Sequence, residues 1–202
     1  MKLLNEYPAL VILGNWNNAI FSPEWVAKYL LLDESMQVDI PINVNGSLRF
    51  SNSDLRFFIV ENKLHITVIN IDDAIYTRIG KIALSLANYL PHTPVSNFGL
   101  NFNFEATTEE IEVPYTMTDI VKIESFGFST DSQLLTRSFK KDDYTLNFTI
   151  SKKDEKILFN FNYHFDITTL LNFKEKFESD SLLTYKAYAL SLLADIYSLK
   201  LS

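Results

Sequence analysis

The sequence predicts an α+β fold: two internally duplicated strand-helix-antiparallel strands-helix units that form one curved sheet, with both long helices packed on the same face. Three observations predict this fold. Short segments alternate apolar and polar residues with the period of a strand, and two long segments repeat apolar residues at three- and four-residue steps. The order of these segments occurs twice, so we expect a single domain made of two pseudo-repeats, approximately 9–90 and 97–201.

The first half opens with a strand and a short helix. An apolar run predicts the strand over residues 10–17. The triplet Ser22-Pro23-Glu24 predicts the start of a helix that runs to about residue 32. A serine caps free backbone amides, a proline is tolerated at the first helical position, and a glutamate favours the positive end of the helix.

Four extended segments and a long helix complete this half. Two turns are predicted, at Asn45-Gly46 and Glu61-Asn62, because such pairs adopt tight hairpin conformations. Asp72 or Asp73 is expected to cap the helix, whose apolar residues share one face until Pro91 ends it. The extended segments are predicted over residues 37–44, 47–51, 55–60 and 63–71.

The second half opens on "NFGLNFNFEA", residues 97–106, which alternates as a strand does. An acidic stretch follows, and residues 117–128 suit a helix or a strand equally well. Asp166 is expected to cap a closing helical region with a break at residues 179–181. Between them, three antiparallel strands are predicted over residues 134–140, 144–151 and 156–165.

Asparagines form a predicted polar strand column in both halves. Asn15 and Asn17 flank a tryptophan in the first strand, and Asn101 and Asn103 flank a phenylalanine in the corresponding strand of the second half. If the two strands adjoin about a twofold axis, the four amides form a structural ladder. The alternative is that they line a groove that recognises a peptide backbone or a small polar ligand.

Composition excludes several classes of protein. The net charge of −7 and the absence of a basic stripe count against nucleic acid as a partner. Without cysteine there is no disulfide, thiolate metal site or cysteine nucleophile, which fits a reducing compartment. No secretion signal is recognisable, so we expect a cytoplasmic protein, and charged residues interrupt the apolar window 182–201, so we expect no membrane partner.

No motif for catalysis, a metal or a cofactor is visible. The three histidines lack metal-ligand spacing, and the five glycines form no phosphate-binding loop. Adjacent acidic pairs fit helix caps and turns better than a catalytic site, whose carboxylates face each other from separate elements. We therefore expect no enzyme, although a triad assembled only by folding would escape this search.

The last helix is the main candidate for partner binding because apolar residues cover most of its circumference. Its predicted partner-binding residues are Leu183, Leu190, Tyr197 and Leu201. The alternative is that other helices of the same chain cover them. Three acids of the insertion, Glu109, Glu110 and Glu112, are expected to steer a basic partner.

These observations favour a non-enzymatic interaction protein: an adaptor, chaperone-like or inhibitory subunit. It would use the C-terminal helix or a sheet face to bind a polypeptide partner, or itself as a homodimer. The alternative is a small-ligand-binding domain with an aromatic pocket between sheet and helices, lined by Phe102, Phe159, Phe161 and Tyr163. A hydrolase or transferase with a dispersed site is the third hypothesis.

Overall fold

The computed structural model describes residues 1–31, 35–41, 47–111, 125–127 and 129–201. These residues form one ten-stranded antiparallel sheet with four α-helices, which confirms the α+β class. The strands are β1 (Lys2–Leu4), β2 (Pro8–Gly14), β3 (Gln37–Asp39), β4 (Arg49–Ser51), β5 (Leu55–Val60), β6 (Lys63–Val68), β7 (Val95–Thr107), β8 (Ser132–Lys141), β9 (Tyr144–Lys153) and β10 (Lys156–Asp166). The α-helices are α1 (Pro23–Val26), α2 (Asp73–Tyr89), α4 (Leu170–Lys176) and α5 (Ser181–Tyr197). Shorter helical turns are η1 (Asn18–Ile20), η2 (Ala27–Leu31) and η3 (Thr108–Glu110).

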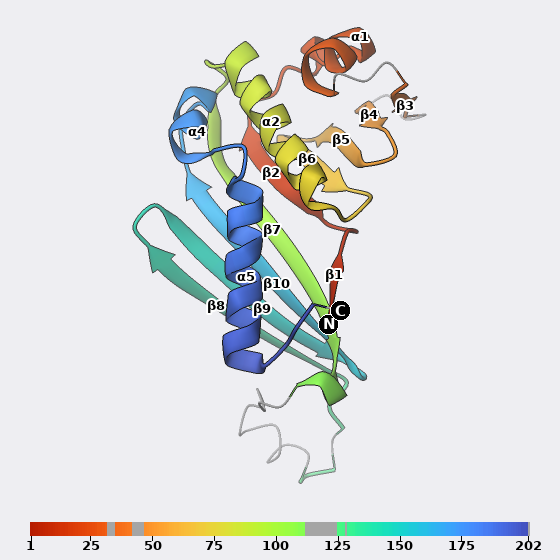
Figure 1. The fold of residues 1–202 in the computed structure, drawn as a ribbon, viewed down its shortest axis with the longest axis vertical. Helices are drawn as coiled ribbons and strands as arrows, with labels where there is room; N and C mark the ends of the chain where they lie inside the picture. The colour runs from red at the N-terminus through yellow and green to blue at the C-terminus, as the bar shows by residue number, and fades with distance from the viewer. Residues whose placement is uncertain (32–34, 42–46, 112–124, 128, 202) are drawn as a thin grey trace.

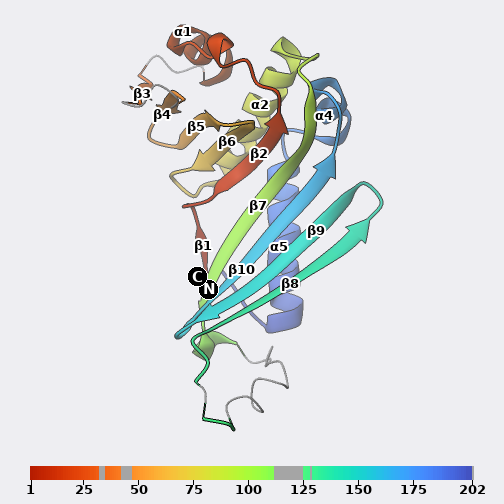
Figure 2. The same ribbon diagram turned by 180° about the vertical axis from the view of Figure 1, so that it is seen from behind.

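The strand order of the sheet is β3-β4-β5-β6-β2-β7-β10-β9-β8, and β1 pairs with the end of β7 (Figures 1 and 2). The first strands of the two halves, β2 and β7, are therefore antiparallel neighbours at the centre. On either side of them the order reads the same outward: β6, β5 and β4 in one direction, and β10, β9 and β8 in the other.

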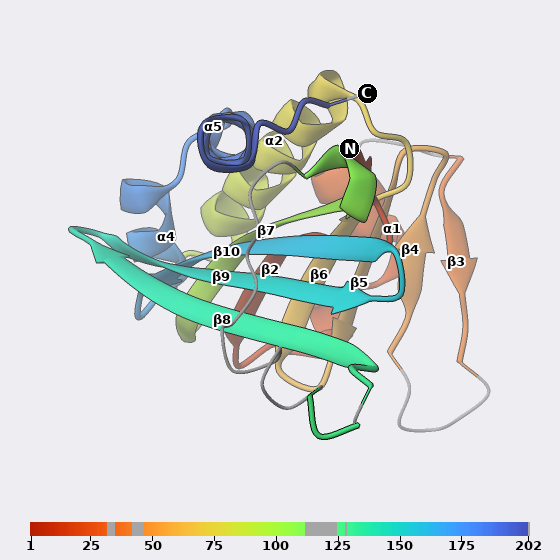
Figure 3. The ribbon, with the colours of Figure 1, turned by 90° about the horizontal axis from the view of Figure 1, so that it is seen from below.

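The long helices α2 and α5 lie on the same face of the sheet (Figure 3). The sheet residues that face them are fully buried, and they include Leu10, Phe98, Phe102 and Phe159, each at most 1% exposed. Burial of such side chains is the main stabilising contribution to the fold, at roughly 25 cal/mol per Å² of apolar surface. The middle of the opposite face carries polar side chains, among them Asn101 and Asn162, whereas Phe58 and Val60 lie on the part of this face formed by β5.

Most local predictions are confirmed. The Ser22 hydroxyl accepts from the Trp25 N–H, and the Asp72 carboxylate accepts from the Ala74 N–H, as a helix N-cap does. The predicted break before the last helix is also present, since α4 ends at Lys176 and α5 starts at Ser181. The helix after Ser22 is α-helical only to Val26 and continues as the π-helical turn η2.

Two predictions about element ends are wrong, and others fall outside the described residues. Asp166 does not cap a helix, because β10 continues through it to pair with Asn97; Thr169 caps α4 instead. The first strand ends at Gly14 rather than at residue 17, where the chain turns away. The predicted turn Asn45-Gly46 and residues 117–124 and 128 are not among the described residues.

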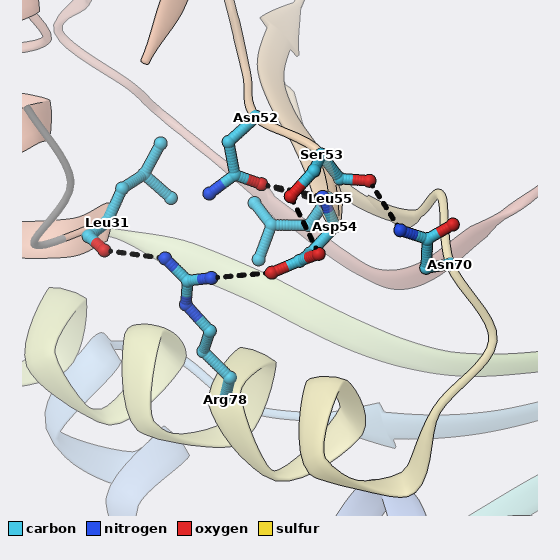
Figure 4. Close-up of polar contacts among 7 residues, drawn as sticks. All are labelled: Leu31, Asn52, Ser53, Asp54, Leu55, Asn70 and Arg78. Atoms are coloured by element: carbon cyan, nitrogen blue, oxygen red, sulfur yellow. Dashed lines mark hydrogen bonds and ion pairs between the residues drawn. The ribbon is translucent and has the colours of Figure 1, made fainter. Parts of the chain in front are cut away.

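Arg78 of α2 ties three segments of the first half together (Figure 4). Its guanidinium donates to the Asp54 carboxylate and to the Leu31 carbonyl, both at 3.0 Å. Asp54 lies in the turn between β4 and β5, and Asn52 closes this turn by accepting from the backbone N–H groups of Asp54 and Leu55. The cluster therefore fixes α2 against η2 and this turn, which is a structural role.

Candidate functional site

A hydrogen-bonded row of side chains crosses the polar face of the sheet. Asn162 donates to the Asn101 amide oxygen at 2.7 Å, and Asn147 donates to the Asn162 amide oxygen at 3.0 Å. Ser138 donates to the Asn147 amide oxygen at 2.7 Å, and Asn101 donates to the Pro8 carbonyl at 3.1 Å. The row joins β8, β9, β10, β7 and β2, and its bonds all run in the same direction, so that they polarise one another.

A second row lies one pair further along the strands. Asn160 donates to the Asn103 amide oxygen at 2.6 Å, and the hydroxyls of Thr136 and Thr149 are 3.2 Å apart. Beyond it, Glu105 lies between two lysine ammonium groups. Their hydrogen bonds, that of Lys2 first, lower the pKa of the Glu105 carboxyl. The asparagine amides in the middle of this face therefore form hydrogen bonds with one another across the strands of the sheet.

The predicted asparagine column exists for only one half of the chain. Asn101 and Asn103 are on β7, but their partners are Asn162 and Asn160 of β10. Asn15 and Asn17 follow the end of β2 and lie exposed outside the sheet; Asn17 caps η1 by accepting from the Ala19 N–H. The missed signal is a second Asn-Phe-Asn triplet, residues 160–162, which pairs antiparallel with residues 101–103.

The acidic insertion is partly used within the chain. Glu110 forms an ion pair with the amino group of Met1 and accepts from the Thr107 N–H. The bond from the amino terminus is the main cause that lowers the pKa of the Glu110 carboxyl. Glu109 is exposed, and Glu112 lies outside the described residues. Glu109 and Glu110 are thus both exposed, but the Glu110 carboxylate is already paired within the chain.

The four predicted binding residues of α5 and the segment after it differ in burial. Tyr197 is buried, with its ring 5.1 Å from that of Phe159, so it belongs to the core. Leu183 and Leu190 are half-buried, and Leu201 is 45% exposed. The sheet and α2 thus cover part of the apolar circumference from within the chain, and of the four predicted residues Leu201 is the most exposed.

The apolar residues of α5 that remain exposed follow one stripe. Tyr188 is 49% exposed and Ile196 is 50% exposed, and half-buried Leu192 lies between them at helical spacing. The ring of Tyr185, on the same side of the helix, is 5.3 Å from that of Tyr144 at the start of β9. This stripe therefore continues along α5 from its contact with the start of β9, which is the neighbour of the edge strand β8.

The helix-facing side of the sheet margin formed by β9 and β8 carries apolar residues on either side of the exposed Arg137. Leu135 and Phe139 of β8 alternate toward the helices, opposite Ile150 and Leu146 of β9. Phe139 is 49% exposed. We define the α5–β8 surface as these exposed and half-buried apolar residues of the two elements and their neighbour on β9: Leu135, Phe139, Leu146, Tyr188, Leu192 and Ile196.

The residues of the predicted aromatic pocket fill the core instead. Phe102, Phe159, Phe161 and Tyr163 are each at most 1% exposed and contact other rings. The packing of this part of the core therefore gives the small-ligand hypothesis no support. Within the described chain there is also no group of three or more His, Asp or Glu side chains placed to hold a metal ion.

The hydroxyl of Tyr163 is buried and has no hydrogen-bond partner among the described residues. Its burial is the first cause that raises the pKa of this phenol. An unsatisfied buried hydroxyl costs about 1–3 kcal/mol, so Tyr163→Phe is expected to raise the free energy of unfolding by about 1 kcal/mol. Urea unfolding measures the change, and Tyr188→Phe, at an exposed tyrosine, is the matched control. If Tyr163→Phe were less stable than the wild type, the Tyr163 hydroxyl would contribute to stability, which contradicts an unsatisfied group.

Comparisons with known proteins assign no family. No family model matches the chain, and neither a curated protein nor a solved structure is significantly similar to it. No helix of the described residues is long and apolar enough to cross a membrane. The function must therefore be inferred from the surfaces themselves.

Proposed function

We propose that this chain is a non-enzymatic interaction protein, an adaptor, chaperone-like or inhibitory subunit of the cytoplasm, that binds a polypeptide through the α5–β8 surface. The observation that carries the proposal is that large apolar side chains stay about half exposed on two elements that both adjoin β9. They are Tyr188 and Ile196 of α5, which contacts Tyr144 of β9 through Tyr185, and Phe139 of β8, which pairs with β9. Full burial of an exposed side chain of this size contributes about 1.5–3 kcal/mol, so covering the exposed half of each contributes roughly half of that. Three of them with half-buried neighbours suffice for the apolar centre of a small interface.

The polar face of the sheet supports the same choice of surface. The amides of Asn101, Asn147 and Asn162 already bond to one another, so they would have to break good hydrogen bonds to recognise a ligand. The leucine, isoleucine and phenylalanine side chains of the α5–β8 surface have no polar atoms, so a ligand that covers them breaks no side-chain hydrogen bond. We therefore assign binding to this surface and structure to the asparagine rows.

We also infer that the two halves arose by duplication. The sheet order supports this inference, because corresponding strands flank the central β2–β7 pair in the same sequence on both sides. The equivalence of α2 and α5, each of 17 residues and placed on the same face, supports it further. In this scheme the α5–β8 surface has no counterpart around α2, where α1 and η2 pack instead, and η2 contacts α2.

A selection of random displayed peptides tests the proposed function. The selection is made on the wild-type protein, and each enriched peptide is then titrated against Phe139→Glu/Ile196→Glu. Two charges in the apolar centre are expected to weaken binding by about 100-fold, because each places an unpaired charge against the ligand. The matched control is Asn15→Glu/Asn97→Glu, which also adds two negative charges but places them outside the surface. Failure to enrich any peptide, or equal binding by both double variants, would contradict the proposal.

A further inference from the structure

The edge strand β8 has one side that no other described strand pairs with, beside the α5–β8 surface. Among the described residues its single strand neighbour is β9, and the two are joined by the two-residue turn Asp142-Asp143. Such a turn makes Lys141 and Tyr144 a hydrogen-bonded pair, and hydrogen-bonded and non-hydrogen-bonded pairs alternate from there. The N–H and C=O groups that point away from β9 are therefore those of Leu134, Thr136, Ser138 and Lys140.

The two strands of this margin are basic although the chain as a whole is acidic. β8 and β9 together carry five basic residues and no acidic one, whereas the chain has a net charge of −7. Their neighbouring acids are confined to the turns at either end. The basic residues are Arg137, Lys140, Lys141, Lys152 and Lys153.

We propose that the ligand of the α5–β8 surface is an extended, acidic polypeptide segment that adds to β8 as a further strand. This inference rests on the proposed function and names the chemistry of its partner. Backbone groups of β8 would hydrogen-bond the segment, its alternate side chains would cover Phe139 and Ile196, and its carboxylates would meet the basic residues of β8 and β9. A second copy of this chain fits poorly, because pairing β8 with itself would place two sets of like charges side by side.

A capped decapeptide of alternating valine and glutamate is the probe, and the same peptide with lysine in place of glutamate is its control. Binding is measured by fluorescence anisotropy at two salt concentrations. We expect the glutamate peptide to bind at least about tenfold more tightly, with the difference reduced in high salt, because exposed charges are screened there. Equal affinity for the two peptides, or no binding of either, would overturn the proposal that the ligand is an acidic segment.

Amide hydrogen exchange of the complex tests strand addition residue by residue. The N–H groups of Leu134, Thr136, Ser138 and Lys140 are expected to become protected by at least about tenfold when the glutamate peptide is bound, whereas those of Arg137 and Phe139, already bonded to β9, change little. Protection that does not alternate along β8 overturns strand addition.

Thr136→Pro and Thr136→Val form a matched pair of variants. Both remove the hydroxyl that contacts Thr149, but only proline removes the outward N–H. Thr136→Pro is expected to bind the glutamate peptide at least about fivefold more weakly than Thr136→Val does, because it loses one hydrogen bond to the peptide. Thermal unfolding of the free variants shows whether each is folded.

The outcomes separate the two proposals. One outcome would support the surface but not the partner. In it, peptides selected on the wild type bind Phe139→Glu/Ile196→Glu more weakly, bind Thr136→Pro and Thr136→Val equally, and are not acidic. The α5–β8 surface would then be correct, and the proposal of an acidic segment added to β8 would be wrong. If the glutamate peptide binds with no sensitivity to Phe139→Glu/Ile196→Glu, the proposed function fails as well.

Discussion

Replacement of Gly80 by valine is expected to lower the free energy of unfolding by about 3 kcal/mol, at the upper end of the usual cost of overpacking. Gly80 is buried in α2, where the chain that connects α4 to α5 crosses it. A Cβ atom added here would lie 2.0 Å from the Ser179 carbonyl oxygen and 2.7 Å from the Ser179 carbonyl carbon. Both are backbone atoms, so the connection or the helix must move as a whole.

Thermal unfolding followed by circular dichroism measures this effect. For a chain of this size we expect the midpoint to fall by about 6–12 °C. Lys81→Val, at the next and exposed position of α2, has the same low helix propensity of valine without the contact, and it should lose only about 0.5 kcal/mol. Equal losses at both positions would contradict the close approach of Ser179 as the constraint on residue 80, because helix propensity alone favours valine over glycine there.

Asn162→Leu is expected to cost about 2–3 kcal/mol, because it leaves two half-buried polar groups without a partner. Asn162 donates to Asn101 and accepts from Asn147 in the centre of the row. The Asn162 side chain packs directly over Gly99, where an added Cβ would lie 2.7 Å from the Asn162 amide nitrogen. The larger apolar side chain therefore breaks the row and has little room beside β7.

Asn97→Leu is the matched control for the asparagine row. Asn97 is on the same face of β7, but its amide donates only to the exposed Ser96 hydroxyl, so its loss should cost less than about 0.5 kcal/mol. Guanidinium unfolding of both variants decides the matter. A stable Asn162→Leu protein would mean that the row contributes little to the sheet, and that its amides are available for ligands.

The sequence predicts the strands and helices well because their signals are local. Alternation over residues 156–165 is the direct consequence of one buried face of β10, and Ser22 and Asp72 cap helices through bonds to residues two or three positions away. Element ends were less predictable. Asp166 fits a cap locally, but the pairing of β10 with β7 keeps it in the strand.

Pairings between distant residues decide the rest of the site. Asn101 was expected beside Asn15, yet the strand register brings it to Asn162, and only the repeated Asn-Phe-Asn triplet hinted at that partner. Tyr197 could not be assigned from its helix alone, because the apolar residues of α5 surround it on most sides. The orientation of α5 over Phe159, a tertiary contact, decides which stripe stays exposed.

The most direct measurement of the central claim is a map of methyl and aromatic chemical shifts with the tightest selected peptide bound. Binding at the α5–β8 surface predicts that the largest changes occur at Leu135, Leu192 and Ile196 and in the rings of Phe139 and Tyr188. Changes confined to the asparagine face, or to residues around α1 and α2, would contradict it.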